Sequence, residues 1–240
     1  MTKFDRDTAV THVGDGRFSA EIAPGWRAVG PNGGYIAALV MRALAEASEA
    51  EGGAGEPRYP RSLTVHYLAP PHEGPVEIET TIDKLGRTVT FVSGRMLQDG
   101  RPTGLARAVF ATMREGPEFA DLSPPPMLSL TDSLVRPDDS PMMLPEISDR
   151  FDTRMGFGGL PFSQATEAVT GGWIRYVEDR PLDHFMIAAL SDAWWPAIFA
   201  RAQQGVSVPT LDLTVHFRTA HPEGFVGPSE HCMVVFRSGQ

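Results

Sequence analysis

The chain has 240 residues, of which 42% are hydrophobic and 21% charged, which is typical of a globular protein large enough for two domains. The formal net charge of −9 argues against a nucleic-acid-binding surface, because phosphate recognition needs clustered Lys and Arg. A single cysteine excludes an internal disulfide, no apolar run reaches the roughly 18 residues that span a bilayer, and the N-terminus has no signal-peptide core, so the sequence predicts a cytoplasmic protein without a membrane span.

The first half is predicted to hold one strand, one helix and then a run of strands. Phe18–Ile22 is expected to be a short strand. Apolar residues at helical spacing over Ile36–Ala47 predict a helix, which Gly52 and Gly53 end. Asp99 and Gly100 predict a hairpin turn between the last two of four further strands. These strands are Ser62–Leu68, Val76–Lys84, Thr88–Gln98 and Thr103–Thr112.

Residues 114–147 are predicted to connect an N-terminal domain, 1–113, to a C-terminal domain, 148–240. Prolines prevent regular structure over much of this connector. They are Pro117, Pro124, Pro125, Pro126, Pro137, Pro141 and Pro145.

The second half is predicted to follow the same plan of strands around a helix. Its one helix is expected within Phe185–Phe199. The expected strands are Arg150–Met155, Gly172–Glu178, Thr210–Arg218 and His231–Phe236.

The two halves repeat each other. Ser62–Gly74 and Asp212–Gly224 share Leu, Thr, Val, His, Glu and Gly in register, with an offset of 150 residues. Ile36–Leu39 and Ile187–Leu190 both read IAAL, with an offset of 151. Two matched blocks in the same order predict a duplicated domain.

The repeat also predicts that the second half lacks its last hairpin. Adding the offset to Phe91–Thr112 places two more strands at about 241–262, beyond Gln240. A sheet that ends there exposes an unpaired edge, so we expect the chain to be a shortened version of a longer protein. The alternative is a second domain that has lost these strands.

Asp192 is the first candidate for chemistry. It is the only charged residue in Phe185–Phe199, a segment apolar on every side and therefore expected to be buried. The IAAL alignment matches it to Met41, so only one half carries a carboxylate here. A buried carboxylate has a raised pKa and can act as a general base or hold a water. The alternative is that Asp192 faces solvent or bonds the backbone at a kink before Pro196.

Thr210 is the second candidate, because a threonine hydroxyl can orient a water by donating and accepting. On the predicted strand it shares one face with Asp212, Thr214 and His216, and a solvated strand face is the alternative interpretation. His66 and His216 recur in both halves, which favours a structural role.

Gly33 and Gly34 begin the first predicted helix. Helix-start N–H groups favour a negative atom, and glycine lets a ligand approach the backbone closely, although a simple tight turn explains the pair as well. No nucleotide-binding motif and no metal-ligand spacing is present, and Cys232 is interpreted as a packing residue.

The pattern resembles the double hotdog fold, an α+β fold with two tandem domains in which an antiparallel sheet wraps around a central helix. More specifically, the chain resembles the acyl-CoA thioesterase II (TesB-like) family. The stretches that carry this resemblance are PNGGYIAALVMRAL, RSLTVHYLAPPHEGPVEIE, GRTVTFVSGRMLQDGRPTGLARAVFAT, HFMIAALSDAWW and PTLDLTVHFR.

The resemblance implies an active site in the second half. The family uses an Asp on the central helix, a Thr or Ser at the start of the next strand and a Gln on the last strand to orient a water against the thioester carbonyl. The Asp falls on Asp192 and the Thr on Thr210. The Gln has no counterpart, because Gln240 lies too early in the repeat.

We therefore expect an acyl-CoA thioesterase that releases a free acid and CoA, without a metal or organic cofactor and as a homodimer. N–H groups near His184 and Phe185 are expected to stabilise the oxyanion, and Trp194 and Trp195 to contact the acyl chain. The first alternative is an acyl-CoA-binding protein without turnover, which the absent Gln favours. The second is a hotdog hydratase, which needs a catalytic His–acid pair that the sequence does not show.

Overall fold

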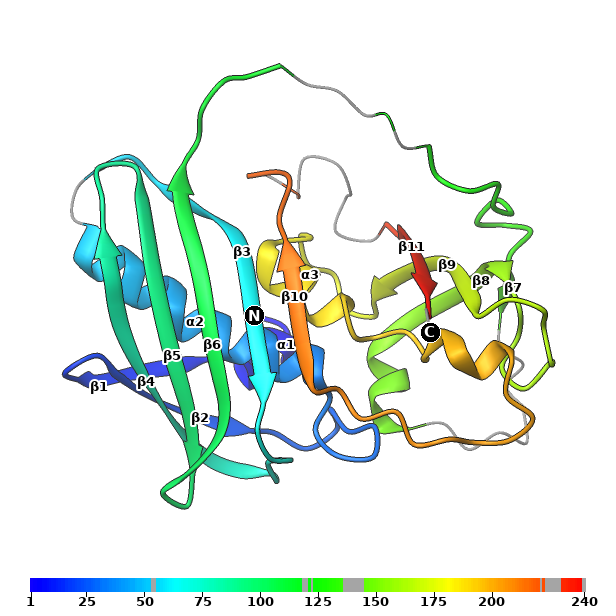
Figure 1. Ribbon diagram of the computed structural model, residues 1–240, viewed down its shortest axis with the longest axis horizontal. Coiled ribbons are helices and arrows are strands. Elements are labelled where there is room, and N and C mark those ends of the chain that lie inside the picture. Colours follow the sequence, from blue (N-terminus) through cyan, green and yellow to red (C-terminus); the bar gives the residue numbers. More distant parts are fainter. Residues whose placement is uncertain are drawn as a thin grey trace.

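Two antiparallel sheets pack against two central helices, α2 (Gly33–Gly52) and α3 (His184–Leu190), in the computed structural model of the protein (Figure 1). The structure describes residues 1–52, 55–117, 121, 123–135, 145–220, 222 and 230–238. No helix in these ranges is both long and apolar enough to cross a membrane.

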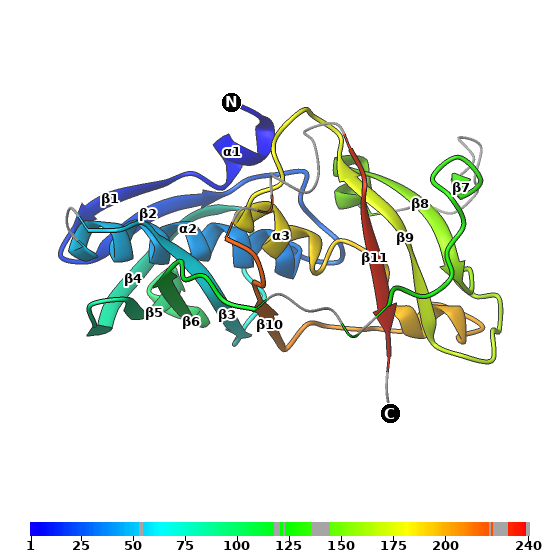
Figure 2. The same ribbon diagram turned by 90° about the horizontal axis from the view of Figure 1, so that it is seen from above.

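The larger sheet has seven strands in the order β1-β2-β4-β5-β6-β3-β10. It curves around α2, which lies on its inner face (Figure 2). Alternation along the strands explains this packing. Leu63 and Val65 of β3 are buried, while Thr64 between them points to the outer face. The strands are β1 (Val10–Gly14), β2 (Arg17–Ile22), β3 (Arg58–Tyr67), β4 (Gly74–Leu85), β5 (Val89–Gln98), β6 (Arg101–Thr112) and β10 (Asp212–His216).

The smaller sheet has the order β11-β9-β8-β7. Its strands are β7 (Leu134–Val135), β8 (Phe151–Gly158), β9 (Val169–Tyr176) and β11 (Cys232–Arg237). The neighbours β8, β9 and β11 repeat the order β1, β2, β4 of the first half. Within the described residues no strand lies between β11 and β10, the place that β5 and β6 hold between β4 and β3. Gly224 and Gln240 lie outside the described residues.

Strand β10 of the second half pairs with β3 of the first, so the larger sheet contains strands from both halves. These two strands are antiparallel, with Asp212 opposite His66, Thr214 opposite Thr64 and His216 opposite Ser62. Thr64 and Thr214 are counterparts at the offset of 150, and they lie opposite each other at the middle of this pairing. The two halves are therefore related by an approximate two-fold axis at this junction.

The halves also share one hydrophobic core. Trp26 stacks on Tyr35 with 4.9 Å between ring centroids, and its ring meets Phe151 and Tyr176 from the second half. Phe4, on the short helix α1 (Lys3–Asp7), fills the same cluster. The two sequence repeats thus bury their apolar surface together.

Some predicted elements differ from the observed ones. The segment Phe185–Phe199 is not one helix, because α3 ends at Leu190 and a turn leads to Pro196 and the 3-10 helix η2 (Ala197–Ala200). Pro196 precedes η2, and its missing N–H does not account for an end of α3 six residues earlier. The connector contains β7 and leads into another 3-10 helix, η1 (Glu146–Arg150), while α1 and β1 are not among the predicted elements. Gly53, Pro137 and Pro141 lie outside the described residues.

Candidate active site

The side chain of Asp192 lies at the N-terminus of α2, in the other half of the chain. Its Oδ2 accepts the backbone N–H of Gly34 at 3.2 Å and the side-chain N–H of Asn32, also at 3.2 Å. The same Nδ2 of Asn32 donates to the main-chain oxygen of Asp192 at 2.8 Å. The site is therefore built from both repeats.

Two glycines make this approach possible. A Cβ at Gly34 would collide with the carbonyl oxygen of Ala189 on α3. A Cβ at Gly33 would lie 2.8 Å from Oδ2 of Asp192 and 3.2 Å from the hydroxyl of Tyr67. The absence of both side chains lets α2 begin directly against the residues that follow α3.

Thr210 reaches the same carboxylate, since its side chain is close enough to lower the pKa of Asp192. It precedes β10, which begins at Asp212, so the strand alternation does not extend to it and the predicted shared face with Thr214 is wrong. Tyr67, the last residue of β3, donates its hydroxyl to the carbonyl of Gly33 at 2.6 Å, which holds the start of α2 beside the carboxylate.

Burial raises the pKa of Asp192 above its ordinary value, and hydrogen bonds from the amides of Gly34 and Gly33 and from Thr210 oppose that rise. A carboxylate that is partly desolvated yet held by donors is suited to accept a proton from water. Burial also raises the pKa of Tyr67, with the charge of Asp192 adding to the effect, so the phenol stays protonated and remains a donor.

The structure does not bring His184 and Phe185 to Asp192. They begin α3, a seven-residue helix about 10 Å long, whereas Asp192 follows its other end. The Nε2 of His184 contacts the carbonyl of Thr219 at 2.9 Å. The guanidinium of Arg42 lies 4.4 Å from the ring centroid of Phe185.

Trp194 and Trp195 follow Asp192 in the chain, and their ring centroids are 4.4 Å apart. The indole of Trp194 is buried, donates to Thr170 at 3.2 Å and stacks on Phe236, so it packs toward the smaller sheet. Both tryptophans are thus close to Asp192 in the sequence, and their adjacent rings lead from it toward Phe236 of the smaller sheet.

His184 and Phe185 lie at the start of α3, the position that the repeat makes equivalent to the start of α2 beside Asp192. The repeat matches them to Gly33 and Gly34, and their bulk fills the space that the glycines leave open. The ring of His184 meets Phe217, the counterpart of Tyr67, edge-on at 5.2 Å. The full set of counterparts for Asn32, Gly33, Gly34, Tyr67, Asp192 and Thr210 is Asp183, His184, Phe185, Phe217, Met41 and Pro60.

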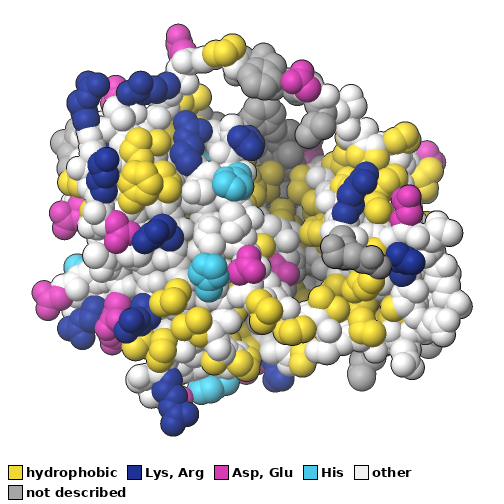
Figure 3. Space-filling view, in the orientation of Figure 1, with side chains coloured by type: hydrophobic (Ala, Val, Ile, Leu, Met, Phe, Trp, Pro, Cys, Tyr) yellow, Lys and Arg dark blue, Asp and Glu magenta, His cyan; other side chains and the backbone are white. Residues whose placement is uncertain are grey.

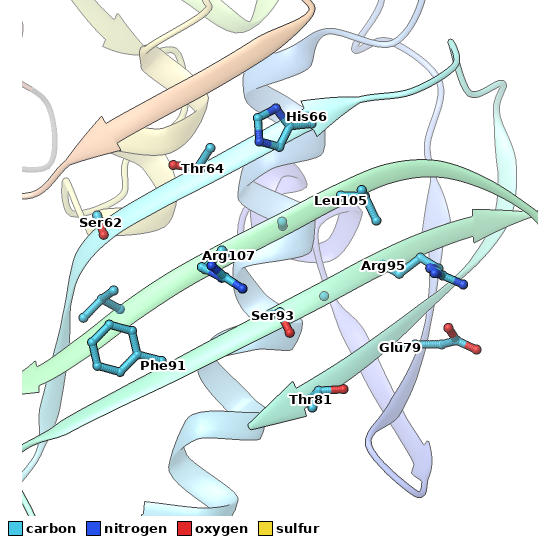
Figure 4. Close-up of a pocket in the computed structure, with 13 residues that line it drawn as sticks. Ser62, Thr64, His66, Glu79, Thr81, Phe91, Ser93, Arg95, Leu105 and Arg107 are labelled. Carbon is cyan, nitrogen blue, oxygen red and sulfur yellow. The ribbon is translucent and has the colours of Figure 1, made fainter. Parts of the chain in front are cut away.

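A groove of about 880 Å³ lies elsewhere, on the outer face of the larger sheet, opposite α2 (Figure 4). Ser62, Thr64 and His66 of β3 line it, with Arg95 and Arg107 from the neighbouring strands. Arg and His side chains gather on this face of the molecule (Figure 3). The groove contains none of the predicted site residues, and it lacks a buried carboxylate at a helix start.

Cys232 behaves as the sequence predicts for a packing residue. Its Sγ contacts the carbonyl oxygen of Ile174 at 3.3 Å, and burial raises the pKa of the thiol to about 11. A thiol with such a pKa is protonated at neutral pH and is a poor nucleophile.

Sequence reasoning missed Asn32 and Tyr67. Asn32 had a signal, because it precedes the Gly-Gly helix start at a position where a capping side chain is preferred. The difference between Asn32 and its counterpart Asp183 could also have drawn attention to it. For Tyr67 the only sequence signal was the hydroxyl group that its counterpart, Phe217, lacks.

Comparison with known families gives two adjoining matches. The model of the acyl-CoA thioesterase N-terminal domain matches residues 22–113, and that of the acyl-CoA thioesterase C-terminal domain matches residues 121–239. No curated protein matches the sequence.

Solved structures show the same architecture. A conserved hot dog fold protein of unknown function from Alicyclobacillus acidocaldarius is 29% identical, with a TM-score of 0.88 over 100% of this chain and 87% of that one. A candidate thioesterase II from Thermobifida fusca is 25% identical, with a TM-score of 0.73 over 99% and 85%. The tesB protein of Mycobacterium avium subs paratuberculosis, at 21% identity and a TM-score of 0.68 over 95% and 82%, shares the fold.

Proposed function

The chain belongs to the acyl-CoA thioesterase family and is a thioester hydrolase, and we propose that it hydrolyses fatty acyl-CoA with a water activated by Asp192 and Thr210. The observation that carries this proposal is the buried carboxylate of Asp192 at the start of α2, within reach of the Thr210 hydroxyl. The products are the free acid and CoA.

In the proposed reaction, Asp192 takes a proton from the water while the water oxygen attacks the thioester carbonyl carbon. Thr210 orients that water through its hydroxyl. The tetrahedral intermediate collapses with cleavage of the carbon–sulfur bond, and the proton held by Asp192 passes to the leaving thiolate. Atoms and charge balance without any further reactant.

The start of α2 supports stabilisation of negative charge at this centre. Gly33 and Gly34 present backbone N–H groups and the positive end of the helix dipole to the carboxylate. Because the Asp192 carboxylate engages these N–H groups, the positive end of the helix dipole is what this helix start offers a developing oxyanion. His184 and Phe185 begin α3 at the end remote from Asp192.

The acyl chain is proposed to pack along Trp194 and Trp195, which follow Asp192 and Ala193 in the chain. Their rings offer an apolar wall beside a polar centre, which is the arrangement that an acyl thioester requires.

The test is CoA release from a panel of short to long acyl-CoAs by the protein, Asp192→Asn and Asp212→Asn. Asp212 is exposed on the outer face of β10 and serves as the matched control. We expect Asp192→Asn to lose roughly 100- to 10,000-fold in rate and Asp212→Asn to keep the rate. Binding of acyl-CoA without release by the unchanged protein would support the binding-protein alternative.

Association into a homodimer remains a prediction. Sedimentation at twice the chain mass of 26.1 kDa would support it, and sedimentation at that single mass would contradict it.

A further inference from the structure

Asn32 occupies the last position before α2 and is only 6% exposed. Its N–H donates to the carbonyl of Trp26 at 2.8 Å, and its own carbonyl accepts the N–H of Ile36 at 3.1 Å. Its side-chain oxygen accepts the N–H of Tyr35 at 3.0 Å and so caps the helix. Because Oδ1 is committed to the helix, Nδ2 points the other way, toward Asp192.

That amide nitrogen contacts two oxygens of one residue. It lies 2.8 Å from the main-chain oxygen of Asp192 and 3.2 Å from Oδ2. An amide carries two N–H groups, so it can make both bonds at once. Contacts to the carbonyl and the carboxylate together restrain the backbone and the side-chain torsions of Asp192, which lies in a turn after α3.

The second half shows that capping alone does not require asparagine. Asp183, the counterpart of Asn32, caps α3 through the N–H of Met186 at 2.8 Å. A carboxylate cap has no N–H to donate, and the counterpart of Asp192 in that half is Met41, which needs none. The cap is an amide only in the half where a carboxylate has to be held.

We propose that Asn32 is a positioning residue, which fixes the Asp192 carboxylate in the orientation that activates water beside Thr210. The inference rests on the proposed function and adds a residue that acts on the reaction through Asp192. A displacement of about 1 Å in a catalytic group can cost about 100-fold in rate, so a residue that holds both ends of Asp192 controls turnover.

The test compares Asn32→Ser with Asp183→Ser. Serine caps helices well, so both variants keep a cap acceptor, and only Asn32→Ser loses the amide that reaches Asp192. For Asn32→Ser we expect kcat to fall about 10- to 100-fold, with KM within about twofold and a lower Tm, because both bonds from Nδ2 are lost. Asp183→Ser is expected to keep kcat.

The pH profile separates positioning from a structural role. Removing a donor from an ionised carboxylate favours its neutral form, so the acid limb of kcat/KM should move to higher pH in Asn32→Ser. If Asn32→Ser does not fold, Asn32→Asp replaces it, because an Asp cap already serves α3. Asn32→Asp also puts a second negative charge beside Asp192 and should shift the acid limb further.

A fall in kcat without movement of the acid limb would overturn the positioning role, as would an unchanged kcat, and both leave the proposed function standing. If the unchanged protein releases no CoA, the proposed function fails. Carboxyl NMR titration of Asp192 then tests the contact alone: a midpoint that rises in Asn32→Ser supports the hold on the carboxylate, and an unmoved midpoint contradicts it.

Discussion

The hydroxyl oxygens of Thr64 and Thr214 lie 3.0 Å apart across the junction of β3 and β10. The two residues are counterparts in the repeat, so this contact marks the approximate two-fold axis of the chain. The axis relates two equivalent positions: the start of α2 beside Asp192, and the start of α3 beside Arg42 in the middle of α2. Only one of them carries Asp192, Thr210 and the two glycines.

Gly34→Ala tests the close approach of α2 and α3. The added methyl group would collide with the carbonyl of Ala189, so we expect the free energy of unfolding to fall by about 1–3 kcal/mol, with a loss of activity. Gly30→Ala is the matched control, since a Cβ there meets no atom within 4 Å. Equal denaturation midpoints for the two variants would show that the start of α2 accommodates a Cβ at residue 34, which would contradict the close contact with Ala189.

Thr210→Val tests the role of the hydroxyl in holding water. Valine keeps the shape of threonine and removes the donor and acceptor, so we expect kcat to fall about 100-fold. Thr210→Ser keeps the hydroxyl and should retain most of the kcat of the unchanged protein. Thr214→Val, at the exposed two-fold junction, is the control for a Thr-to-Val change on the same segment and should leave kcat unaltered.

The raised pKa of Asp192 sets a sign for stability as well as activity. Because burial disfavours the ionised carboxylate, the folded state is penalised at pH values above the folded pKa, and the penalty is relieved as pH falls through it. Asp192→Asn should therefore have a higher Tm than the unchanged protein at neutral pH, with a difference that shrinks in acid. A lower Tm at neutral pH would mean that the charge stabilises the fold.

The acid limb of kcat/KM follows from the same cause. Activity requires the ionised carboxylate, so it should fall as pH drops through a value above the ordinary Asp range. The pH–rate profile of the unchanged protein measures this directly. A limb at or below the ordinary range would contradict the proposed general base.

The start of α3, the position equivalent to the start of α2, is predicted to have a structural role only. Asp5 of α1 pairs with Arg42 at 3.1 Å and with Arg180 at 2.9 Å, and Arg180 also pairs with Asp183 at 2.7 Å. Burial raises the pKa of Asp5, but bonds from Thr2 and Arg180 outweigh it and hold the pKa at about 2.

Asp5→Asn should therefore lower Tm at neutral pH without changing kcat. The stabilisation is present above the unfolded pKa and is lost as pH falls toward 2, so the Tm difference between variant and unchanged protein should vanish in strong acid. A Tm difference that persists at the same size at pH 2 would assign the effect to packing instead of charge.

Much of the fold and part of the site could be predicted from sequence, because they depend on local pattern and on the repeat. Alternation located β3 to β6, and the unequal pair Asp192 and Met41 pointed to one functional half. The early end of α3 was missed because the apolar run continues past Leu190 without a local stop signal. His184 was misplaced because the antiparallel arrangement of α2 and α3 is a tertiary property.

The most direct test of the central claim is a single turnover of an acyl-CoA in ¹⁸O-labelled water. If Asp192 activates water for direct attack, the label appears in the released acid and the carboxylate of Asp192 remains unlabelled. If the label is found in the Asp192 carboxylate, the residue attacks the thioester itself through an acyl-enzyme, and the general-base account is wrong.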